Sequence, residues 1–79
     1  MRVLNGDTDT SVKSISIYLT MSEAKQMLGY LEQLVDDSYN DHFHLNDDSY
    51  EHEITLVVYN QSDLAVFDAR SQVLIEQDK

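Results

Sequence analysis

The sequence predicts a small α+β domain, and three patterns support this prediction. Residues 54–59 are mostly apolar on both faces of a strand, and residues 12–19 alternate between apolar and polar side chains. Between them, residues 21–35 place apolar side chains three and four positions apart, which is typical of an amphipathic helix. A chain of 79 residues has room for one such domain. We expect a β-α-(β)-β-α order, with a mainly antiparallel sheet of two to four strands and two helices on one face.

The chain divides into an N-terminal segment and the expected domain. The first eleven residues are polar and contain turn chemistry at Asn5-Gly6, which predicts either a flexible segment or a short strand. The domain then covers residues 12–79. Its first expected element is the alternating strand at 12–19, in which Ile15 and Ile17 share one face.

Both helices have recognisable start signals. Thr20 and Glu23 match a capping box, in which each side chain accepts a hydrogen bond from the backbone N–H of the other residue. We therefore expect the first helix at 21–35. Ser62 is a natural N-cap for the second helix, with Asp63 in its first turn.

An acidic connection, residues 36–53, lies between the first helix and the strand at 54–59. It contains seven of the fifteen acids and all three histidines, and it has no lysine or arginine. His42-Phe43-His44-Leu45 alternates and predicts a short strand within it. Asn46-Asp47-Asp48-Ser49 is typical turn chemistry.

The connection supports a partner-binding hypothesis. Fifteen acids against five bases give a net charge of −10, which disfavours direct binding to nucleic acid and favours a basic partner protein. Carboxylates on a folded surface can imitate phosphates, and interleaved aromatic rings supply apolar contacts. The expected partner-binding residues are Asp36, Asp37, Tyr39, Asp41, Phe43, Asp47, Asp48, Tyr50, Glu51 and Glu53. The alternative is that this region is a solvated acidic loop.

The most concrete form of this hypothesis is a DNA mimic that inhibits a nucleic-acid-binding protein. Its target would be a nucleoid-associated protein, a polymerase component or a defence nuclease. By analogy with other small acidic proteins, it could be phage-encoded and act in the host cytoplasm, or serve as an immunity-type partner of a basic toxin. A homodimer is a further possibility that the sequence leaves open, because so small a domain gains stability by association.

A second hypothesis is a metal-binding module. His42 and His44 would project from the same side of a strand, and His52 or a nearby aspartate could complete a site for zinc. The chain has no cysteine to supply a thiolate ligand. Solvated histidines are the simpler interpretation, so we expect no cofactor.

Catalysis is disfavoured by what the sequence lacks. Gly6 and Gly29 are the two glycines of the chain, so no glycine-rich phosphate loop is present. No nucleophile, base and orienting group stand in a recognisable pattern, and a small domain offers little pocket volume. We expect a non-enzymatic protein. The absence of cysteine and of a signal-peptide pattern leads us to expect a cytoplasmic location.

Overall fold

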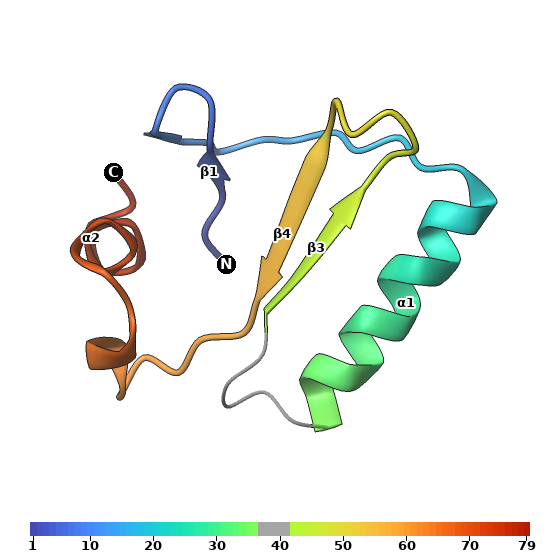
Figure 1. The fold of residues 1–79 in the computed structure, drawn as a ribbon. Helices are drawn as coiled ribbons and strands as arrows, with labels where there is room; N and C mark the ends of the chain where they lie inside the picture. The colour runs from blue at the N-terminus through green and yellow to red at the C-terminus, as the bar shows by residue number, and fades with distance from the viewer. Residues whose placement is uncertain (37–41) are drawn as a thin grey trace. The chain divides into compact units, whose positions relative to one another are not determined.

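The computed structural model describes residues 1–36 and 42–79 and confirms an α+β fold. Its elements are β1 (Leu4–Asn5), β2 (Thr10–Ser11), α1 (Met21–Asp36), β3 (His42–Asn46), β4 (Glu53–Val57), a 3-10 helix (Leu64–Val66) and α2 (Ala69–Gln77), as Figure 1 shows. The strands form two antiparallel pairs, β1 with β2 and β3 with β4. The order is therefore β-β-α-β-β-α.

The chain forms two compact units. The central unit is Tyr18–Tyr59, with α1, β3 and β4, and the terminal unit combines Met1–Ile17 with Asn60–Lys79. Each unit has its own helix and its own antiparallel strand pair. The expected packing of both helices on one sheet face stays a prediction.

In the central unit, α1 packs against the β3–β4 hairpin. The predicted capping box starts the helix: Thr20 N–H donates to Glu23 Oε1 at 2.9 Å, and Glu23 N–H donates to Thr20 Oγ1 at 3.2 Å. Leu34 from α1 and Leu45 from β3 are buried. Tyr30 stacks on Phe43, with ring centroids 4.8 Å apart. These contacts hold the helix on one face of the hairpin.

The hairpin register separates two faces. His42 pairs with Val57, His44 with Thr55, and Leu45 with Ile54. Because successive strand residues point to opposite faces, the face with Phe43 and Leu45 meets α1. The opposite face is formed by His42, His44, Asn46, Glu53, Thr55 and Val57.

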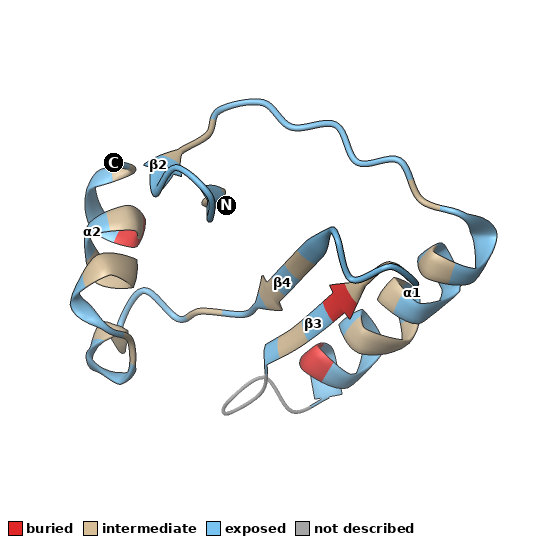
Figure 2. Ribbon diagram, turned by 45° about the horizontal axis from the view of Figure 1, so that its top comes forward, coloured by how far each residue is buried: buried red, intermediate tan, exposed pale blue. Residues whose placement is uncertain are grey.

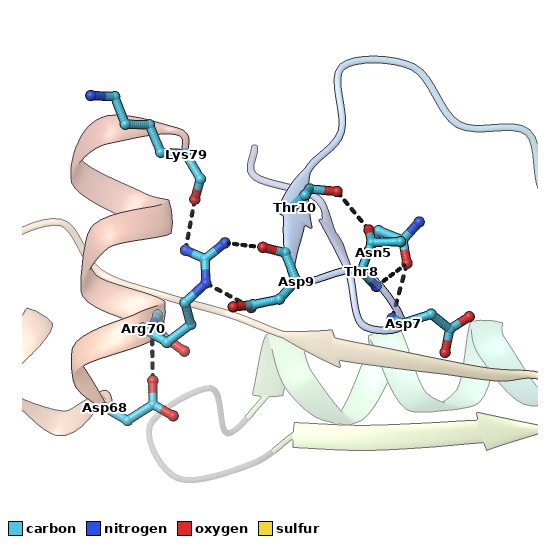
Figure 3. Close-up of polar contacts among 9 residues, drawn as sticks. Asn5, Asp7, Thr8, Asp9, Thr10, Asp68, Arg70 and Lys79 are labelled. Atoms are coloured by element: carbon cyan, nitrogen blue, oxygen red, sulfur yellow. Dashed lines mark hydrogen bonds and ion pairs between the residues drawn. The ribbon is translucent and has the colours of Figure 1, made fainter.

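In the terminal unit, basic side chains join the N-terminal segment to α2. Arg2 Nε donates to the carbonyls of Leu74 and Ile75, both at 3.1 Å. Lys13 pairs with Asp78. The Arg70 guanidinium, which comes from the first turn of α2, lies between Asp9 and the carbonyl of Lys79 (Figure 3).

Little of the described chain is fully buried. Most of the ribbon in Figure 2 is exposed or half-buried. Among the described residues, Leu34, Leu45 and Ile75 are the buried hydrophobic side chains. Several large apolar side chains remain in water, which leaves apolar surface for further contacts.

Two expected elements differ from the structure. Residues 12–19 lie outside any helix or strand, although Ile15 and Ile17 alternate with polar residues as in a strand. Alternation shows which side chains would share a face, but a strand also needs an edge to pair with. The second helix starts at Ala69 with Asp68 as its N-cap, not at Ser62. Ser62 instead donates to Asn60 Oδ1 at 2.8 Å, and extended Phe67 separates the 3-10 turn from α2.

Candidate functional site

The negative charge is concentrated in the central unit. Tyr18–Tyr59 contains nine acids and one base, Lys25, so its net charge is −8. The terminal unit contains six acids and four bases, so its net charge is −2. The central unit is therefore the part of the chain that attracts a basic partner more strongly.

The β3–β4 connection and the first residue of β4 form a compact acidic turn, defined as residues 47–53. Asp47 organises it: Oδ1 accepts from the backbone N–H of Glu51 at 2.9 Å and of His52 at 3.2 Å. Oδ2 contacts His52 Nδ1 at 2.6 Å. The backbone adds a bond from Tyr50 N–H to the Asp47 carbonyl at 3.0 Å. This network gives the turn a defined shape.

The same contacts shift two pKa values. The hydrogen bond from His52 is the main reason that the pKa of Asp47 lies below its ordinary value. Reciprocally, the hydrogen bond to Asp47 is the main cause that raises the pKa of His52, and the charges of Asp47, Glu51 and Glu23 act in the same direction. Asp47 is thus held as a carboxylate inside the turn.

The four acids of the turn fall into two kinds. Asp47 faces His52, and Glu53 Oε1 lies 2.5 Å from His44 Nδ1. Asp48 and Glu51 are exposed, and neither forms an ion pair with any residue that the structure describes. The last two carboxylates are therefore the ones free to meet a cation from outside.

Tyr50 stands between these two free carboxylates. Its φ of 56° lies in the left-handed region, where a side chain with a Cβ is disfavoured. Its side chain is 80% exposed. The turn thus holds an aromatic ring in water in a conformation that opposes its backbone preference, and such positions occur often at binding sites.

The other expected partner-binding residues lie elsewhere or outside the described part. Asp36 is the exposed last residue of α1, whereas the acidic turn approaches Glu23 in the first turn of that helix (Figure 1). Phe43 is half-buried against Tyr30. Asp37, Tyr39 and Asp41 lie outside the described residues. The structure brings together Asp47, Asp48, Tyr50, Glu51 and Glu53.

The histidines do not converge. His42 and His44 are edge to face, with ring centroids 5.1 Å apart, and His52 contacts Asp47 in the turn. His44 Nδ1 also lies 2.9 Å from Thr55 Oγ1. Within residues 1–36 and 42–79, no group of three or more histidines and carboxylates could hold a metal ion.

Sequence reasoning missed the different roles of the acids. Asp47, five residues before His52, appeared equivalent to Asp48, although it holds the turn together. Asn46-Asp47 followed by polar residues is a sequence pattern typical of an Asx-turn, and it could have indicated that Asp47 bonds the backbone of the turn. The stacking of Tyr30 on Phe43 had no local signal, because it depends on how α1 lies on the hairpin.

The chain matches no known family model, no curated protein and no solved structure. Among the described residues, no helix combines the length and the apolar character needed to cross a membrane.

Proposed function

We propose that this chain is a small non-enzymatic binding protein whose acidic turn engages a basic partner protein. The proposal is carried by the environment of Tyr50. Its side chain is exposed, its backbone has a left-handed conformation, and in the sequence it lies between Asp48 and Glu51, whose carboxylates are free. Aromatic rings are frequent hot spots of protein interfaces, and charges around them guide association. Asp47 holds the backbone of the turn through its hydrogen bonds, so the backbone that carries these groups loses little freedom on binding.

In its most concrete form, the partner is a nucleic-acid-binding protein, and the acidic turn occupies its basic surface as a DNA mimic. Such a surface is lined with lysine and arginine that otherwise neutralise phosphates. The net charge of −8 on the central unit supplies the matching field. The proposed setting is the cytoplasm, which the absence of cysteine fits. In this proposal the chain itself binds neither nucleic acid nor membrane directly.

The test starts with capture of a basic partner from cell lysate at low salt, followed by affinity measurements with the purified pair. Asp48→Asn combined with Glu51→Gln should weaken binding on the order of tenfold. Duplex DNA should compete with the protein, and added salt should weaken the complex steeply. Asp47 is left unchanged because its loss would disrupt the turn.

A matched control separates local recognition from overall charge. Asp7→Asn with Glu76→Gln removes the same two charges from exposed positions of the terminal unit and should leave affinity nearly unchanged. Tyr50→Asn should also weaken binding, because asparagine tolerates the left-handed backbone but removes the ring. Equal effects of the two charge-neutralising pairs would refute recognition by the acidic turn.

A further inference from the structure

Helix α1 carries more apolar surface than the hairpin covers. Tyr30 stacks on Phe43, Leu34 is buried, and Met27 is half-buried on the same side of the helix. A second apolar row runs beside this packed face and is exposed. We call it the exposed row; it consists of Met21, Ala24, Leu28, Leu31 and Val35.

The exposed row has the spacing of a helix-pairing seam. Its members are three, four, three and four residues apart, which is the alternation of the two apolar positions of a heptad. Leu28 is 57% exposed and Val35 is 81% exposed, so the hairpin does not satisfy them. A row of this kind is normally covered by another helix.

Charges beside the row match a second copy of the same helix. Lys25 and Glu32 are seven residues, or about two turns, apart and therefore flank the same side of the row. Neither forms an ion pair with any residue that the structure describes. The midpoint between them falls at Leu28-Gly29, which is also the centre of the exposed row. An antiparallel copy therefore sets each Lys25 opposite a Glu32.

We propose that α1 forms an antiparallel, two-fold symmetric helix pair with α1 of a second copy of this chain. In this pairing the same surface is used twice, as a closed dimer requires. A shallow apolar hollow lined by Leu31, Glu32, Val35 and Asp36 lies at one end of the row. The antiparallel arrangement brings Met21 of the second copy over this hollow, and methionine fills irregular gaps well.

This dimer is independent of the proposed partner binding. The acidic turn approaches the first turn of α1 near Glu23, so pairing the helices in opposite directions puts the two acidic turns at opposite ends of the pair. Because α1 has 16 residues, these ends are roughly 24 Å apart. The dimer leaves both acidic turns accessible.

The experiment measures the mass of the full chain by sedimentation equilibrium at moderate salt, which screens repulsion between two acidic copies. The wild type should be a dimer. Leu28→Glu should weaken the dimer at least about tenfold while circular dichroism retains the helix signal, because this side chain is half exposed. Val73→Glu, a similar change in α2, should leave the dimer intact.

Charge reversal tests the direction of the pair. Lys25→Glu alone and Glu32→Lys alone should each weaken the dimer on the order of tenfold, because each places like charges opposite one another. The double variant Lys25→Glu with Glu32→Lys should restore it. A monomeric wild type, a dimer that survives Leu28→Glu, or a double variant no tighter than the single variants would overturn the proposal. None of these outcomes depends on binding by the acidic turn, which is tested separately.

Discussion

Neighbouring acids of the acidic turn perform different physical tasks. The Asp47 carboxylate accepts two backbone N–H groups and contacts His52, so its oxygens are used within the turn. Asp48 is one residue further along the chain and exposed. A charge engaged internally stabilises the turn, whereas an exposed charge acts on the surroundings. We therefore propose that Asp47 maintains the shape of the acidic turn, whereas Asp48 and Glu51 bind the partner.

The Asp47–His52 contact predicts a pH dependence of the turn. The lowered pKa of Asp47 contributes stability that is complete above about pH 4 and is lost as the pH falls through that pKa. The raised pKa of His52 contributes stability that is complete below about pH 6.5 and is lost as the pH rises through that pKa. The turn should be most stable between these limits.

Amide hydrogen exchange of Glu51 and His52, corrected for intrinsic rates, measures this effect. In the wild type, the protection of these two amides against exchange should decline above neutral pH. His52→Gln should give weaker protection that is flat over the same alkaline range. An unchanged alkaline decline in this variant would show that His52 is not the titrating group.

At the scale of elements, the sequence predicted what depends on neighbours along the chain. The capping box and the apolar spacing placed α1 at 21–35, and the structure gives Met21–Asp36. The alternation at His42–Leu45 predicted β3, and the apolar run at 54–59 predicted β4, which occupies Glu53–Val57. Local hydrogen bonds and side-chain periodicity determine these elements.

What depends on distant contacts could not be predicted in the same way. Ile15 and Ile17 have the pattern of a strand, but pairing is decided by the edge that is offered. Ser62 and Asp68 are both good N-caps, and the structure uses Asp68, which accepts from Ser71 N–H at 2.8 Å. The uneven distribution of charge between the two units could also not be predicted from the sequence, because the units themselves are defined by the fold.

The packing of α1 on the hairpin predicts a large effect of one core substitution. Leu34 is 1% exposed, and Leu34→Ala should reduce the free energy of unfolding by about 2–5 kcal/mol, because it leaves a cavity in a small core. Urea unfolding followed by circular dichroism measures this loss. Tyr18→Ala, at a side chain that is 93% exposed in the same unit, should change stability by less than about 0.5 kcal/mol. Similar losses for both variants would contradict the assignment of Leu34 to the core.

At the scale of the whole molecule, the two units use charge in opposite ways. In the terminal unit, Arg70 bonds Asp9 and Lys13 pairs with Asp78, so attraction joins its segments. The central unit has one base for nine acids, so repulsion among its carboxylates opposes its compact state. Salt screens both attraction and repulsion between exposed charges.

Added salt should therefore affect the stability of the two units differently. Residue-resolved amide exchange at low and high sodium chloride should show rising protection in α1, β3 and β4, because repulsion in the central unit is screened. Protection in α2 should stay level or fall, since its ion pairs with the N-terminal segment weaken. Arg70→Gln should reduce the salt sensitivity of α2, because it removes one of these two ion pairs, without changing the response of α1. A uniform rise across both units would mean that general salt effects on apolar burial outweigh the uneven distribution of charge.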